Sequence, residues 1–188
     1  MWVQPVSERN VRKMNLRIFK SDMEMLGALT EFYLGVTTYL DSHINYPKWT
    51  PGVYPGEESI RAAINAGTQY VCMEGDEIVG AFIYNADPQG AYENGDWEVE
   101  LNEGEYAVIH SLAVAVKHYG EGIGTKMVEF CIEKAKNEGY KAVRLDIVPE
   151  NIPAKRLYEK AGFKYAGEKD LNRGFEDIPT FQLFELNF

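Results

Sequence analysis

The 188-residue sequence contains only two cysteines, Cys72 and Cys131. These are too few for a disulfide framework or a four-ligand zinc site, so we expect free, buried thiols, no metal and a cytoplasmic location. No run approaches the ~18 apolar residues that a membrane helix needs, and we expect no membrane partner. The polar residues 1–13 lack the apolar core of a secretory signal, and we interpret them as a leader that precedes the folded part.

Basic residues are also scarce. The chain has 19 Lys and Arg against 29 Asp and Glu, a net charge of −10, which argues against binding to nucleic acid. Between Ala62 and Val116 there is no lysine or arginine, so the excess of negative charge lies in one segment. This segment contains ten carboxylates: Glu74, Asp76, Glu77, Asp87, Glu93, Asp96, Glu98, Glu100, Glu103 and Glu105.

The apolar content is sufficient for a sizeable core, at 45% hydrophobic and 13% aromatic residues. Ser21 and Glu24 have the spacing of a capping box, which predicts the start of the first helix. Periodicity predicts helices over Met25–Leu40, Glu57–Ala66, the segment from Gly124 to Gly139, and Asn151–Gly162. It predicts strands over Leu16–Phe19, Gln69–Met73, Glu77–Asn85, Tyr106–Val116, Ala142–Ile147, Phe163–Glu168 and Thr180–Leu186.

One glycine pattern points to chemistry. A predicted buried strand runs directly into Gly120-x-Gly122-x-Gly124, and a helix follows. Glycines let the backbone approach a ligand closely, and the N-terminus of a helix offers unpaired N–H groups and a positive dipole end, which suit a pyrophosphate. The loop is not a Walker A motif, because Thr125 and Lys126 follow in the wrong order. It is not a dinucleotide fingerprint either, because the glycine spacing differs.

A second pattern follows one helix and one strand later. It reads Asn151-x-x-Ala154-x-x-Leu157-Tyr158-x-x-x-Gly162-Phe163. Together with the glycine loop, this pattern resembles the GNAT superfamily of acetyl-CoA-dependent N-acetyltransferases. The resemblance extends from Leu16 to about Leu186 and implies one domain over residues 14–188. The fold it implies is a mixed α/β (α+β) GNAT fold. A mostly antiparallel sheet of six to seven strands is splayed at its central strand and flanked by about four helices.

The resemblance also implies a site for acetyl-CoA as cosubstrate. The central strand would pair with the pantetheine arm, the glycine loop would hold the pyrophosphate, and Asn151 would contact the cofactor arm. Tyr158 would direct its hydroxyl at the sulfur and protonate the leaving thiolate. The implied cofactor-binding residues are Leu112, Ala113, Val114, Tyr119, Gly120, Gly122, Ile123, Gly124, Thr125, Asn151 and Tyr158.

This sequence departs from the family pattern in two places. Tyr119 stands where the family usually has Arg or Gln, and Val116 stands where many members have Pro. Because backbone N–H groups provide most of the hydrogen bonds to the phosphates, we expect the loop to bind the pyrophosphate despite these changes. Lys117 and Lys126 are the candidates to supply the missing positive charge.

The general base is less clearly marked. His110 lies in the central strand just before the cofactor-pairing residues, and its ordinary pKa near 6.5 suits proton removal at neutral pH. The alternative is a core histidine that bonds to backbone. Glu98 and Glu100 are further candidates, acting through water. The alternation Trp97-x-Val99-x-Leu101 would place both on the polar side of a strand, if one forms there.

The acceptor is expected to be a small-molecule or peptide amine. Tyr46, Trp49, Tyr54 and Trp97 lie in the irregular segments that wall the acceptor pocket in such a fold, where they could hold an apolar or cationic group. The acidic segment would attract a cation, or it is a solvated loop. Other interpretations are a CoA-binding sensor without turnover, another acyl group, or an oxygen acceptor. The assembly is expected to be a monomer or homodimer.

Overall fold

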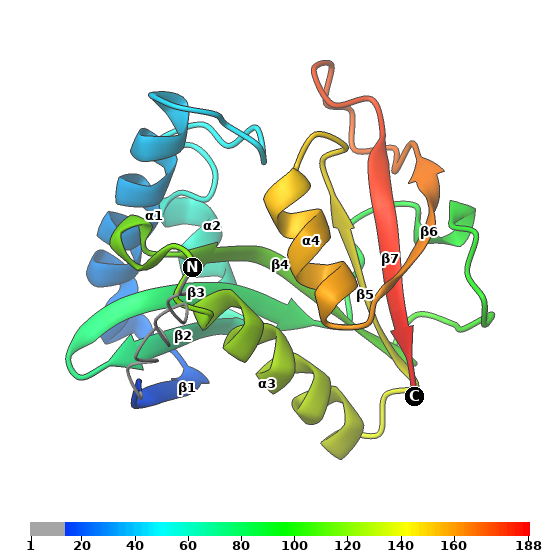
Figure 1. The fold of residues 1–188 in the computed structure, drawn as a ribbon, viewed down its shortest axis with the longest axis horizontal. Helices are drawn as coiled ribbons and strands as arrows, with labels where there is room; N and C mark the ends of the chain where they lie inside the picture. The colour runs from blue at the N-terminus through cyan, green and yellow to red at the C-terminus, as the bar shows by residue number, and fades with distance from the viewer. Residues whose placement is uncertain (1–13) are drawn as a thin grey trace, which may run out of the picture.

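A computed structural model of the chain describes residues 14–188, so the leader predicted for residues 1–13 lies outside the described part. The described residues form a seven-stranded sheet in the order β1-β2-β3-β4-β5-β7-β6 (Figure 1). The strands are β1 (Leu16–Lys20), β2 (Gln69–Glu74), β3 (Glu77–Asn85), β4 (Tyr106–Val114), β5 (Ala142–Ile147), β6 (Lys164–Lys169) and β7 (Phe181–Asn187). The predicted mixed α/β class and the strand count are confirmed.

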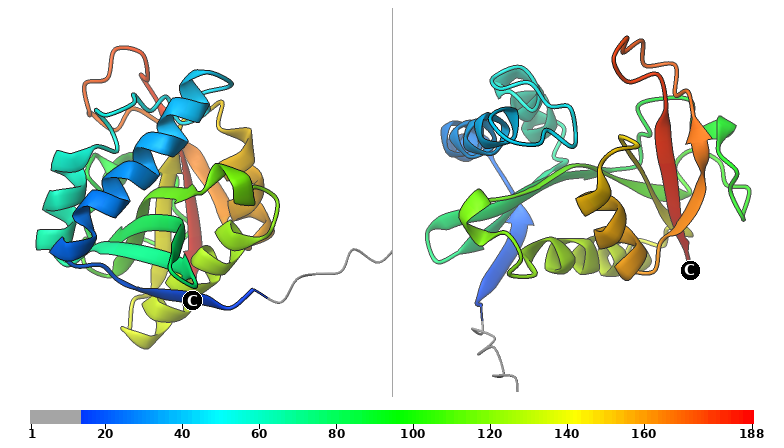
Figure 2. Two further views of the ribbon diagram at one scale, coloured as in Figure 1. Left: turned by 90° about the vertical axis from the view of Figure 1, so that its left-hand side faces the viewer. Right: turned by 45° about the horizontal axis from the view of Figure 1, so that its top comes forward.

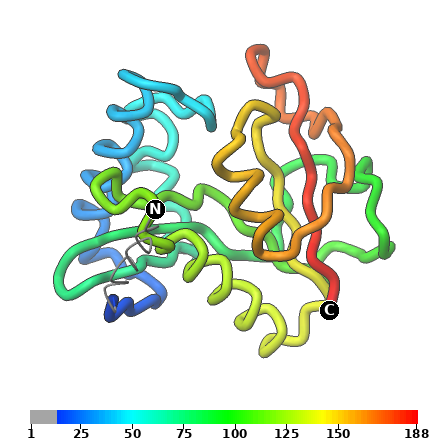
Figure 3. Tube along the Cα trace, in the orientation of Figure 1, coloured from blue at the N-terminus to red at the C-terminus, as the bar shows by residue number. Residues whose placement is uncertain are grey.

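Four α-helices pack on the two faces of this sheet within residues 14–188. One face carries α1 (Leu26–Asp41) and α2 (Glu57–Asn65), and the other carries α3 (Ile123–Asn137) and α4 (Ile152–Lys160) (Figure 2). Separate apolar clusters lie under the two layers, so both faces of the central strands are buried. The N-terminal strands and α1 lie at one end of the molecule, and the C-terminal strands at the other (Figure 3). The central strands join these two ends.

The sheet divides between β4 and β5, the only parallel neighbours among its strands. Their pairing runs from Tyr106↔Ala142 to Val108↔Arg144 and then stops. All other neighbouring strands are antiparallel. The second half of β4 therefore lacks a partner on its β5 side, and its backbone groups are open to a ligand. The predicted splay at the central strand is confirmed.

A β-bulge lies in the unpaired half of β4. The register changes from Ile83↔His110 to Ala81↔Ala113, so β4 has one more residue than β3 in this stretch. Ser111 lies within the bulge and adopts a positive φ of 50°. Because the bulge shifts the alternation of β4 by one residue, Leu112 and Val114 pack on the same α3 side as Ile109, while Ala113 packs in the α1/α2 cluster.

The predicted helix caps, free cysteines and absence of a membrane helix can each be compared with the structure. The capping box at Ser21 is wrong: Asp22 caps a short 3₁₀ helix, η1 (Met23–Met25), and Ser21 instead donates to the Gln69 carbonyl. The N-cap at Asn151 is confirmed, since its side chain accepts from the Ala154 N–H. Cys72 and Cys131 are free and buried, as expected. No helix in residues 14–188 is long and apolar enough to cross a membrane.

Candidate active site at the divergence of β4 and β5

The glycine loop connects β4 to α3. After the short 3₁₀ helix η3 (Val116–His118), Gly120 and Gly122 adopt φ values of 82° and 86°, in the left-handed region that glycine tolerates best. Gly122 is the N-cap of α3, a helix of 15 residues. The first N–H groups of a helix have no partner within it, so this end offers unpaired donors that suit an anion.

A cavity of about 790 Å³ opens beside this loop. We call it the glycine-loop cavity; it is bordered by β4, the glycine loop, the first turn of α3, α4 and the segment after α1. None of the described residues that line it is Asp or Glu, which suits an anionic ligand. The lining includes every residue that the family resemblance implies for the cofactor: Leu112, Ala113, Val114, Tyr119, Gly120, Gly122, Ile123, Gly124, Thr125, Asn151 and Tyr158.

Tyr158 reaches this cavity from α4, with 5% of its surface exposed. Burial raises the pKa of Tyr158 far above its ordinary value, and the nearby Cys131 and Asp146 raise it further. The phenol is therefore protonated at neutral pH. It makes no hydrogen bond to any of residues 14–188, so its proton is available to a ligand.

His110 lies on β4 just before the bulge. Its Nε2 is 2.9 Å from the Asp87 carbonyl oxygen and 3.2 Å from Asn85 Oδ1. A carbonyl oxygen only accepts hydrogen bonds, so Nε2 carries the hydrogen and Nδ1 keeps the lone pair. Burial lowers the pKa of His110, and the nearby Asp146 carboxylate partly opposes this. The imidazole is therefore neutral near pH 7 and has a basic nitrogen at Nδ1.

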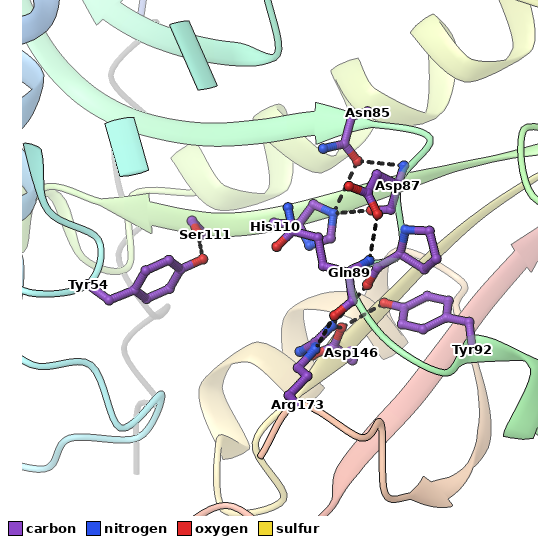
Figure 4. Close-up of polar contacts among 10 residues, drawn as sticks. Tyr54, Asn85, Asp87, Gln89, Tyr92, His110, Ser111, Asp146 and Arg173 are labelled. Carbon is purple, nitrogen blue, oxygen red and sulfur yellow. Dashed lines mark hydrogen bonds and ion pairs between the residues drawn. The ribbon is translucent and has the colours of Figure 1, made fainter. Parts of the chain in front are cut away.

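Three further polar residues around His110 were not found from the sequence (Figure 4). Asp146 on β5 accepts two hydrogen bonds from Arg173, at 2.7 and 2.8 Å, and one from the Tyr92 hydroxyl at 2.7 Å. Arg173 also donates to the Gln89 carbonyl, which ties the loop before β7 to the loop after β3. Burial lowers the pKa of His110 and raises that of Tyr158, and the Asp146 carboxylate acts to raise both.

A second cavity, of about 810 Å³, lies between α2 and the loop after β3. We call it the α2 cavity. Asn85 and Asp87 line it, and they also hold His110. Glu103 lines it too, and no Lys or Arg is among its described lining residues. Of the aromatic residues expected around an acceptor, Tyr54 lines this cavity, whereas Tyr46 and Trp49 line the glycine-loop cavity.

Trp97, Glu98 and Glu100 line neither cavity, and neither does His110. The segment that contains them forms no strand. The Trp97 ring packs 4.0 Å from the guanidinium of the buried Arg144, and the Glu98 carboxylate pairs with Lys164. The alternating pattern alone could not show that this segment packs against β5 and β7 instead of forming a strand.

Lysines from other parts of the chain neutralise much of the acidic segment. Asp96, Glu98 and Glu105 pair with Lys169, Lys164 and Lys141, respectively. Lys117 and Lys126, the lysines expected to serve the glycine loop, each pair with a carboxylate. Lys117 pairs with Glu77 at 2.6 Å and Lys126 with Glu129 at 2.7 Å, and neither lines the glycine-loop cavity.

The fold and the glycine-loop cavity define an acyltransferase-like architecture, and comparison with known proteins identifies the family. The chain matches the acetyltransferase (GNAT) family over residues 37–163 and belongs to that family. A structure titled as a GNAT-family acetyltransferase from Streptococcus agalactiae superposes with a TM-score of 0.77 at 16% identity, covering 93% of this chain and 97% of that one. A putative acetyltransferase from Salmonella typhimurium, solved with acetyl-CoA, gives 0.61 at 19% identity, covering 92% and 93%.

Curated relatives match over a shorter stretch. An aminoglycoside N(6')-acetyltransferase type 1 from Klebsiella pneumoniae is 36% identical over 102 residues, 53% of this chain and 49% of that protein. A spermine/spermidine N(1)-acetyltransferase from Bacillus subtilis is 34% identical over 101 residues, 53% of this chain and 60% of that protein. The similarity thus spans about half to three fifths of these relatives.

Proposed function

We propose that the protein transfers the acetyl group of acetyl-CoA to a primary amine, and that the amine belongs to a cationic acceptor. The observation that carries this proposal is the glycine-loop cavity. It combines the free N-terminus of α3, the unpaired half of β4 and the protonated Tyr158. A protein of the same fold was solved with acetyl-CoA, which supports the choice of ligand.

The residues of the cavity fit this ligand. At Gly120 and Gly122 a Cβ would meet no atom within 4 Å, so the space above both glycines is open for a pyrophosphate. We infer that the N–H groups of the glycine loop bind the pyrophosphate and that the edge of β4 from Leu112 to Val114 pairs with the amides of the pantetheine arm. Asn151, whose amide oxygen already caps α4, has its nitrogen left for the same arm.

The chemistry needs a neutral amine, a donor to the carbonyl oxygen and a proton for the thiolate. Acetyl-CoA supplies an activated acyl group as a thioester. His110 Nδ1 accepts a proton from the ammonium form of the acceptor, directly or through one water. The neutral amine attacks the thioester carbon, and a backbone N–H of β4 near Leu112 donates to the carbonyl oxygen. As the C–N bond forms and the C–S bond breaks, Tyr158 donates its phenolic proton to the sulfur, and the proton lost by the attacking nitrogen restores the phenol.

The cationic acceptor is supported by charge around the α2 cavity. Asp87 and Glu103 line the cavity beside His110, while Arg173 is balanced by its pair with Asp146. Relatives named for aminoglycosides and for spermine and spermidine point to the same class of amine. A second ammonium on the acceptor would then lie near the two carboxylates when the first reaches His110.

The test is steady-state kinetics with acetyl-CoA and matched amines: spermidine, a peptide with an N-terminal lysine, and a neutral monoamine. We expect spermidine to have the highest kcat/KM, falling steeply as ionic strength passes ~0.1 M. The double variant Asp87→Asn, Glu103→Gln should raise the KM for spermidine about 3- to 10-fold and leave that for acetyl-CoA unchanged. The control Glu98→Gln, whose carboxylate pairs with Lys164, should change neither. A preference for the neutral amine would reject the cationic acceptor.

A further inference from the structure

One face of α4 forms a wall of the glycine-loop cavity. Pro153, Leu157 and Lys160 all line the cavity, and their spacing of four and three residues places them on one stripe of the helix. Leu157 marks where this stripe meets the glycine loop, because a Cβ on Gly124 would lie 3.3 Å from its Cδ2. Lys160 lies one turn beyond this contact, ~4.5 Å further along the helix axis.

Lys160 also differs from the other basic residues near the loop. It is the only Lys or Arg among the described residues that line the cavity. It forms no ion pair or hydrogen bond with any of residues 14–188, whereas Lys117 and Lys126 each have a carboxylate partner. His118, which also lines the cavity, is bonded to Glu121 at 2.7 Å. Lys160 is therefore the free cation on this wall.

We propose that Lys160 binds the 3′-phosphate of CoA and makes the protein distinguish CoA from 3′-dephospho-CoA. The inference rests on the proposed function, because it takes the cavity to hold CoA. The ribose follows the pyrophosphate along CoA, so with the pyrophosphate on the glycine loop it would lie next to that loop, and Lys160 lines the same cavity one helix turn from the contact between the loop and Leu157. A phosphomonoester carries about −1.5 to −2 charges at pH 7, more than either phosphate of the pyrophosphate, so it is the group that a free lysine favours most.

The experiment measures the Kd of CoA and of 3′-dephospho-CoA by isothermal titration calorimetry at low salt. We compare the wild type, Lys160→Gln and the control Lys155→Gln, which lies on the same helix but does not line the cavity. The wild type should bind CoA about 5- to 10-fold more tightly than 3′-dephospho-CoA. Lys160→Gln should remove this difference by weakening CoA alone, Lys160→Arg should restore it, and Lys155→Gln should leave it unchanged.

Two results would overturn the assignment of Lys160 while leaving the proposed function intact. They are equal weakening of both ligands by Lys160→Gln, and wild-type-like discrimination in that variant. If the wild type binds neither CoA nor 3′-dephospho-CoA, the proposed function fails together with this inference.

Discussion

The phenol oxygen of Tyr33 lies 2.9 Å from the carbonyl oxygen of Ser111, so the buried face of α1 holds the bulge of β4 directly. Ser111 has a φ of 50°, a conformation that costs a residue with a side chain about 1–2 kcal/mol. Its hydroxyl lies 2.6 Å from the Tyr54 hydroxyl, which adds a contact from the segment after α1 (Figure 4). The two tyrosines fix the strand between His110 and Leu112, where the proposed base and the proposed N–H donor stand.

The Tyr54–Ser111 contact is expected to support turnover without supporting cofactor binding. Tyr54→Phe and Ser111→Ala should each lower kcat about 3- to 10-fold and leave the Kd of CoA unchanged. The double variant should lose no more than either single variant, because each removes the same hydrogen bond. Tyr165→Phe on β6 is the matched control, since Tyr165 lines neither cavity. Additive losses in the double variant would show that the two hydroxyls act separately.

Replacing Gly122 should abolish CoA binding. In Gly122→Val the new side chain points into the open space above the loop and strains a backbone with a φ of 86°. Gly75→Val is a matched control, because Gly75 also has a positive φ and open surroundings but lies in the β2–β3 turn. At ~100 times its Kd, CoA should stabilise the wild type and the control by roughly 2.7 kcal/mol in thermal unfolding, and should not stabilise Gly122→Val. If CoA still stabilises Gly122→Val in thermal unfolding, the pyrophosphate binds elsewhere.

His110 should set the acidic limb of the pH–rate profile. Its pKa is lowered by burial, so the neutral imidazole, which is the active form of a base, persists below pH 6.5. We expect kcat/KM for the amine, after correction for the ionisation of the amine itself, to rise with pH and level off before the ordinary histidine pKa is reached. His110→Ala should remove this limb and most of the activity. If the limb is unchanged in that variant, the base is another group or water.

Tyr158→Phe should lower kcat by roughly 10²- to 10⁴-fold, because it removes the proton for the leaving thiolate. The hydroxyl makes no hydrogen bond within residues 14–188, so its loss should cost little stability. The Kd of CoA should change less than 3-fold by calorimetry. Pre-steady-state measurements check that chemistry limits the rate. If full turnover persists with chemistry rate-limiting, Tyr158 is not the acid.

The sequence predicted the fold, and the residues that it assigned to the cofactor line one cavity, because local patterns encode both. The glycine loop contains left-handed turns, and Asn151 caps the short helix that carries Tyr158, so their spacing carries the family resemblance that assigned them. The acceptor side depends on contacts between distant segments. Arg173 reaches Asp146 across 27 positions and Tyr33 reaches Ser111 across 78, and neither pair has a local signal. Residues 97–101 have a strand-like alternation, but they form no strand, and Trp97 instead packs on the guanidinium of Arg144.

The most direct test of the account is acetyl transfer itself. Purified protein is incubated with acetyl-CoA and spermidine, and free CoA thiol and acetylated amine are measured together by thiol titration and mass spectrometry. The account predicts that both products form in equal amounts, and that His110→Ala and Gly122→Val form neither at a comparable rate. Tight binding of acetyl-CoA without release of CoA in the presence of spermidine or any other amine would contradict it, and would show a cavity that binds the cofactor without using it.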